Sequence, residues 1–103
     1  MKKTFPNSDI TKIKIGIPEG HKHIRTIIET KNGEKLIFQE ATIANIVRAY
    51  TIIKTHPQKR ALELAQKQLS DKKEGYADNQ LIETDKDEVI IKKEITDTYD
   101  ECY

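Results

Sequence analysis

Asn32 and Gly33 stand between two segments of alternating apolar and polar residues, and this pattern constrains the fold more than any other feature of the chain. The flanking segments are 22–30 and 35–39, and Asn-Gly between such segments is a strong signal for a β-hairpin. Further upstream, 10–17 alternates in the same way, and a Pro-Glu-Gly turn at 18–20 follows it. The sequence therefore predicts a three-stranded antiparallel meander.

The length of the Asn-Gly loop decides which residues share a face of this sheet. A two-residue loop places Ile28 opposite Ile37 and mixes charge into both faces. A three-residue loop, with Gly33 as a left-handed bulge residue, places Ile28 opposite Leu36 and separates apolar from charged positions. We therefore expect the three-residue loop.

The first turn sets the position of the first strand. A four-residue loop over 18–21 places Ile15 opposite Ile24 and Ile13 opposite Thr26. The expected core face then consists of Ile13, Ile15, Ile17, Ile24, Ile28, Leu36 and Phe38.

The outer face of the predicted sheet is basic with a small apolar centre. Lysine and arginine side chains contact phosphates, and an apolar centre can pack on sugar or base. The candidate nucleic-acid-binding residues are Lys12, Lys14, His23, Arg25 and Lys35, and the apolar pair in the middle is Ile27 and Ile37. The alternative is an ordinary solvated sheet face, on which charges such as Glu29 and Lys35 pair across strands.

Helical spacing replaces alternation after the sheet, with apolar residues from Ile43 to Ile53 and a start capped at or near Thr42. Pro57 then suits the first turn of a second helix, which we expect to continue to a C-terminal cap at Gly75. Ile52 falls on the polar side of the first helix and is a candidate partner contact. The predicted fold class is α+β, a small three-stranded antiparallel meander covered by a two-helix hairpin.

Charge is distributed unevenly along the chain. Residues 1–73 hold 15 Lys and Arg against 7 Asp and Glu, whereas 74–103 hold 3 against 10. We therefore expect a compact βββαα domain over 1–75 and an acidic, partly disordered C-terminal tail over 76–103. Within the tail, 89–95 is a candidate fourth strand, added to an open sheet edge of the same chain or of a neighbour.

Several function classes find no support in the sequence. One cysteine, Cys102, excludes an intramolecular disulfide and a multi-cysteine zinc site, and the spacing of His21 and His23 is a weak metal signal. No nucleophile elbow, phosphate loop or dinucleotide fingerprint is present. The start lacks the apolar stretch of a signal peptide, and no apolar run is long enough to span a bilayer. We expect a cytoplasmic protein that is not an enzyme, with no metal or cofactor and no membrane partner.

Two function classes remain. The first is a small non-enzymatic module that contacts the DNA or RNA backbone through the outer face, while the acidic tail modulates affinity by competing for the same cations. The second is a protein-interaction or self-assembling module, in which Ile27, Ile37 and Ile52 meet a protein partner or a second copy. The charge distribution favours the first.

Overall fold

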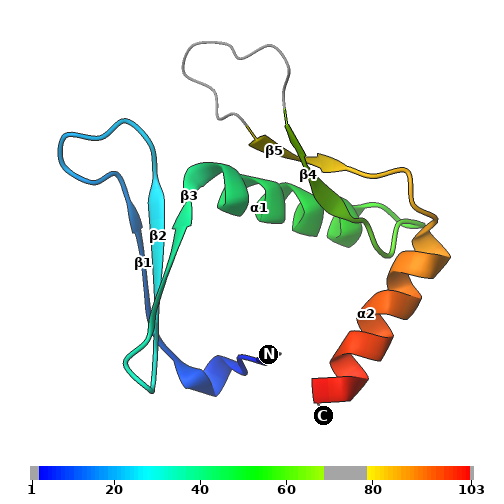
Figure 1. Ribbon diagram of the computed structural model, residues 1–103, viewed down its shortest axis with the longest axis horizontal. Coiled ribbons are helices and arrows are strands. Elements are labelled where there is room, and N and C mark those ends of the chain that lie inside the picture. The colour runs from blue at the N-terminus through cyan, green and yellow to red at the C-terminus, as the bar shows by residue number, and fades with distance from the viewer. Residues whose placement is uncertain (1–2, 69–78, 103) are drawn as a thin grey trace. The chain divides into compact units, whose positions relative to one another are not determined.

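The computed structural model describes residues 3–68 and 79–102, and its α+β composition confirms the predicted class. By internal contacts the chain divides into two compact units, one extending to Ala44 and the other running from Asn45 to Glu101. The elements in chain order are η1 (Asn7–Asp9), β1 (Ile10–Gly16), β2 (Arg25–Thr30), β3 (Lys35–Gln39), α1 (Glu40–Thr55), β4 (Leu64–Gln68), β5 (Asn79–Glu83) and α2 (Glu88–Cys102) (Figure 1).

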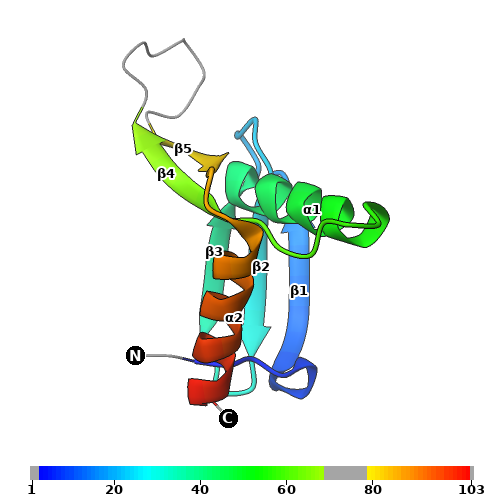
Figure 2. The ribbon, with the colours of Figure 1, turned by 90° about the vertical axis from the view of Figure 1, so that its right-hand side faces the viewer.

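β1, β2 and β3 form the predicted antiparallel meander, with β2 in the middle (Figure 2). Thr30 and Glu34 close a three-residue loop that ends at Gly33, whose φ of +82° is the left-handed conformation that glycine adopts without strain. The Gly33 amide donates to the Thr30 carbonyl at 3.0 Å, and the Thr30 amide donates to the Glu34 carbonyl at 3.0 Å. Ile28 consequently lies opposite Leu36, so the predicted register of this hairpin is confirmed.

The register between β1 and β2 is two residues away from the predicted one. Ile15 lies opposite Thr26 instead of Ile24, so this part of the prediction is wrong. The difference arises where β2 begins: the Ile24 amide donates to Oε1 of Glu40 at 3.2 Å, and pairing with β1 starts at Arg25. Because side chains alternate with a period of two, a two-residue shift leaves the side chains from Lys12 to Ile15 on their predicted faces.

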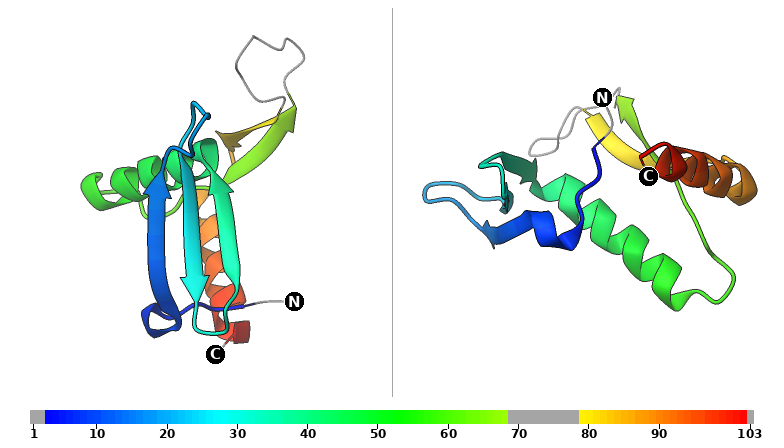
Figure 3. Two further views of the ribbon diagram at one scale, coloured as in Figure 1. Left: turned by 90° about the vertical axis from the view of Figure 1, so that its left-hand side faces the viewer. Right: turned by 90° about the horizontal axis from the view of Figure 1, so that it is seen from below.

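The apolar face of this sheet is covered unevenly. Thr26 and Thr30 on the central strand are only 5 and 7% exposed, whereas Ile13, Ile15 and Ile17 are 62, 62 and 60% exposed. β1 is an edge strand with a neighbour on one side only, as the left panel of Figure 3 shows, and its apolar row remains in contact with solvent. The prediction that these three isoleucines are core is therefore wrong. The other predicted core residues are half-buried: Ile24, Ile28, Leu36 and Phe38.

α1 confirms the first predicted helix, although it begins at Glu40 and Thr42 is not its cap. The helix follows β3 without a loop. Glu40 in its first turn places a carboxylate at the positive end of the helix dipole, which is a favourable position.

The second predicted helix, over 57–75, is wrong for the part that the structure describes. β4 occupies Leu64–Gln68 and pairs with β5, with Ala65 opposite Ile82. The predicted cap at Gly75 lies outside the described residues. The two-helix hairpin is thus replaced by one helix and a two-stranded sheet.

A helix, α2, also replaces the predicted strand at 89–95. Asp87 starts this helix, because its Oδ1 accepts the Val89 amide at 2.7 Å and its carbonyl accepts the Ile91 amide at 3.1 Å. Ile91 is only 5% exposed and, with Ala61 at 2%, marks the best-buried apolar positions of the second unit.

Candidate functional site

The strand register gathers the cationic residues of β1, β2 and β3 on one side of the sheet. Lys12 lies opposite Glu29, which lies opposite Lys35 on the other neighbouring strand. Lys14 lies opposite Ile27, the next pair on the same side of the sheet. We call this side the basic face, and it consists of Lys12, Lys14, Arg25, Ile27, Glu29, Lys35, Ile37 and Gln39.

An apolar pair occupies the middle of the basic face. Ile27 and Ile37 lie directly opposite each other on β2 and β3. Ile27 is half-buried by its neighbours on both sides, whereas Ile37 on the edge strand is 65% exposed. The basic face therefore presents one exposed aliphatic side chain between its cations.

Glu29 is the one acidic residue of the basic face. Its Oε2 lies 3.4 Å from Nζ of Lys14, an ion pair without hydrogen-bond geometry, since the same oxygen accepts no hydrogen bond from the described residues. An ion pair with one exposed partner contributes little to stability. The basic face holds four cations and a single carboxylate, so it carries a net positive charge.

Arg25 and His23 differ from the three lysines in how they are held. Arg25 is half-buried and donates from Nη1 to the Ile24 carbonyl at 3.1 Å. His23 precedes β2, and its Nδ1 lies 3.2 Å from Oε2 of Glu40. The Ile24 amide, and next the His23 side chain, lower the pKa of Glu40 below its ordinary value. His23 is thus engaged at the start of α1, and Lys12, Lys14 and Lys35 are the exposed cations of the face.

Ile52, the third predicted partner residue, is not on the basic face. It belongs to α1 beyond Ala44, in the second compact unit, and it is half-buried. Ile27 and Ile37 come together as predicted, and Ile52 belongs to the other unit.

Ion pairs within the second unit involve several acidic residues of the predicted tail. Glu83 pairs with Lys59 at 2.8 Å, and Lys86 bridges Glu63 at 3.0 Å and Glu94 at 3.1 Å. The hydrogen bond that Lys59 donates to Glu83 raises the pKa of Lys59, and those that Lys86 donates to Glu63 and Glu94 raise the pKa of Lys86.

Glu88 has a different role in the same unit. Its Oε1 accepts the amides of Arg60 and Ala61, the latter at 2.9 Å, and these bonds lower its pKa. The carboxylate thereby joins the start of α2 to the chain ahead of β4.

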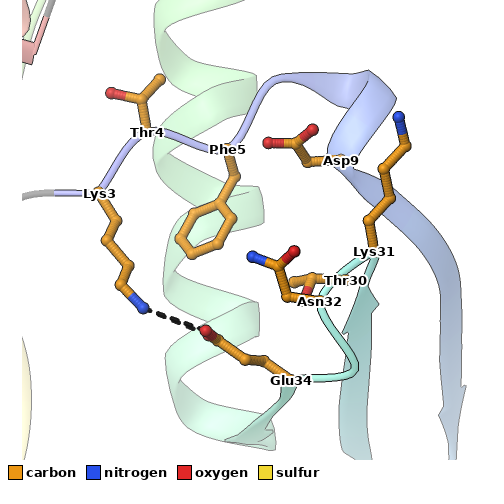
Figure 4. A pocket seen from close by; sticks show the side chains of 8 residues that line it. All are labelled: Lys3, Thr4, Phe5, Asp9, Thr30, Lys31, Asn32 and Glu34. Carbon is orange, nitrogen blue, oxygen red and sulfur yellow. Dashed lines mark hydrogen bonds and ion pairs between the residues drawn. The ribbon is translucent and has the colours of Figure 1, made fainter.

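A pocket at the loop between β2 and β3 is a feature that the sequence reasoning missed. We call it the turn pocket; its volume is about 230 Å³, and its lining comprises Lys3, Thr4, Phe5, Asp9, Thr30, Lys31, Asn32 and Glu34 (Figure 4). The N-terminal segment reaches the loop because the Lys31 amide donates to the Asp9 carbonyl at 2.9 Å. Phe5, an aromatic residue just ahead of a proline, was the one sequence signal that this segment has a packing or binding role.

Residues 3–68 and 79–102 contain neither a cluster of side chains for a metal ion nor a helix that could cross a membrane. No three His, Cys, Asp or Glu side chains of this part of the chain lie close enough together to hold a metal ion. Neither of its two helices has the length and apolar character needed to cross a membrane. Comparisons of the chain with protein-family models, curated proteins and solved structures found no match.

Proposed function

We propose that this protein is a small non-enzymatic binding module that contacts the phosphate backbone of DNA or RNA through the basic face. The observation that carries the proposal is the strand register, which brings Lys12, Lys14 and Lys35 to one side of a three-stranded sheet together with Arg25. Lysine and arginine that neutralise phosphates release condensed counterions, and this release supplies most of the affinity of sequence-independent binding.

The apolar pair at the centre supports the same function. Ile37 is exposed between the cations, where it can pack on a sugar or a base while the lysines contact phosphates on either side. Contacts between lysine and phosphate carry no sequence information, so the expected binding depends on salt and little on sequence.

Binding of labelled oligonucleotides by the full-length protein tests the proposal. We expect the triple variant Lys12→Ala, Lys14→Ala, Lys35→Ala to lose most of the affinity at low salt. The matched control is Lys54→Ala, Lys67→Ala, Lys92→Ala, which removes the same charge from exposed positions outside the basic face. Equal losses in the two triple variants would show that net charge alone governs binding and would reject a defined site.

A second candidate, self-association or capture of a protein partner, is favoured by the apolar row on β1. Ile13, Ile15 and Ile17 are each 60% exposed or more, on the side of the sheet opposite the basic face. Monomeric proteins seldom leave such a row in solvent. This candidate predicts a dimer in sedimentation experiments that Ile13→Thr with Ile15→Thr dissociates; a monomer at all concentrations would reject self-association.

A further inference from the structure

We propose that the turn pocket receives a single unstacked base, so that the ligand class of the module is single-stranded nucleic acid. This inference rests on the proposed function and deepens it. A volume of about 230 Å³ lies below the roughly 300–1,000 Å³ of pockets that enclose a whole drug-sized ligand. The pocket is therefore large enough for one planar ring system, and the rest of the ligand would lie outside it.

The first supporting observation is an unpartnered hydroxyl. Thr30 is only 7% exposed, lines the turn pocket, and its Oγ1 is buried with no hydrogen-bond partner among the described residues. A buried hydroxyl without a partner destabilises a protein, since the group has lost its bonds to water. A ligand that displaces the atoms covering this hydroxyl, and that has donor and acceptor atoms on its edge, would satisfy it.

The second observation is an aromatic ring beside an amide. Phe5 is 42% exposed, and Figure 4 shows its ring between the N-terminal segment and the loop that carries Asn32. An aromatic face stacks on any base, and a carboxamide offers both a donor and an acceptor to a base edge. These two side chains and the Thr30 hydroxyl are the groups that recognise a heterocycle.

Charge distinguishes the turn pocket from the basic face. Two cations, Lys3 and Lys31, balance two carboxylates, Asp9 and Glu34, and Nζ of Lys3 lies 3.2 Å from Oε1 of Glu34. A lining without net charge accepts a neutral base more readily than a phosphate, whose negative charge the carboxylates would repel.

The chain connects the two sites directly. Glu34 of the turn pocket is followed by Lys35 of the basic face, and Thr30 is preceded by Glu29, which lies between Lys12 and Lys35. Successive side chains of a strand point to opposite faces, so Thr30 lies on the side of the sheet opposite these lysines, and a nucleic acid that uses both sites would pass around the loop end of β2 and β3. A duplex keeps its bases stacked and paired, so only a single strand can use both sites.

Substitution of Phe5 in the full-length protein tests the stacking contact. We expect Phe5→Ala to weaken binding of a labelled single strand roughly 5- to 100-fold, the size of one base–aromatic stack, and to leave duplex binding unchanged. Phe5→Leu keeps the apolar bulk and should weaken binding similarly, whereas Phe5→Tyr should retain it. Unchanged single-strand affinity in folded Phe5→Ala would overturn the inference.

Thr30→Val separates binding from folding, because valine has the shape of threonine without the hydroxyl. The melting temperature should stay the same or rise, since an unpartnered buried hydroxyl is removed, while single-strand affinity should fall about 2- to 10-fold. A variant with altered stability and wild-type affinity would assign Thr30 a structural role only and would count against the pocket.

A nucleotide titration and a comparison of the variants distinguish failure of this inference from failure of the proposed function. Nucleoside monophosphates at millimolar concentration should shift the backbone amide resonances of Thr30 and Asn32 in wild type and not in Phe5→Ala, which would identify a free nucleotide as a sufficient ligand. Shifts caused equally by a free amino acid would overturn base recognition. If the triple lysine variant loses binding and Phe5→Ala does not, base binding in the turn pocket is rejected and phosphate binding by the basic face is supported. If the wild-type protein binds no oligonucleotide, both proposals are rejected.

Discussion

Gly33 is the single residue on which the composition of the basic face depends most. Its φ of +82° closes the three-residue loop that sets the register of β2 and β3, and a Cβ there would meet nothing within 4 Å. Gly33→Ala should therefore destabilise the protein by about 1 kcal/mol through backbone strain alone, measured by chemical denaturation. Gly16→Ala is the control, because Gly16 has equally open space and no positive φ. Equal effects of the two substitutions would contradict this explanation.

Glu40 links the chain ahead of β2 to the start of α1, and its contribution depends on pH. Bonds from the Ile24 amide and His23 hold its pKa below the ordinary 4.5, so the folded state favours the carboxylate. The resulting stability is fully present above that ordinary value and is lost as the pH falls through the lowered pKa. Denaturation of Glu40→Gln should thus show a deficit against wild type at neutral pH that shrinks in acid. Glu19→Gln, in an exposed turn, should show no such pH-dependent deficit.

At the scale of elements, α2 depends on a cap that lies outside the helix. Oδ1 of Asp87 accepts the Val89 amide at 2.7 Å, and loss of such a cap costs about 1 kcal/mol. Asp87→Ala should lower the melting temperature, whereas Asp85→Ala, an equal charge change two residues earlier, should have little effect. A matching loss in both variants would mean that charge, rather than capping, stabilises the helix.

The elements that the sequence predicted are those with local causes. The hairpin around Gly33 follows from turn chemistry, and α1 follows from helical spacing that begins beside the sheet. β4 instead requires β5, which lies more than ten residues further on, and the chain before it is held by Glu88 from a distant segment. Such tertiary contacts override local propensity. In α2, the four-residue spacing of Ile91 and Ile95 after Asp87 was a helix signal, and the alternation of Val89 and Ile91 obscured it.

The sequence likewise predicted the cations of the basic face, which follow from local alternation, and missed the turn pocket, which depends on distant contacts. All four cations of the basic face follow from alternation, and a two-residue shift at Ile15 did not change their side of the sheet. His23 was misplaced because its partner, Glu40, belongs to another element. The turn pocket was missed because it forms where the segment around Phe5 meets a loop that follows it by more than twenty residues.

At the scale of the whole molecule, the charge difference between the two parts of the sequence predicts self-competition. Glu83 and Glu94 of the C-terminal part pair with Lys59 and Lys86, and Asp97 pairs with Lys93 within α2, while the sequence adds Asp100 and Glu101 at its end. Amide substitution of Asp97, Asp100 and Glu101 should therefore raise oligonucleotide affinity at low salt, measured by fluorescence anisotropy. Unchanged affinity in this variant would contradict modulation by the acidic tail.

The salt dependence of oligonucleotide binding by the full-length protein tests the central claim most directly. With up to four phosphate contacts, the logarithm of the affinity should fall against the logarithm of salt concentration with a slope of about −3 for a single strand. Each lysine removed from the basic face should reduce the slope by about 0.7, and the Lys54, Lys67 and Lys92 control should keep the wild-type slope. A slope near zero, or one that the control reduces as much as the Lys12, Lys14 and Lys35 variant, would contradict a phosphate-binding sheet face.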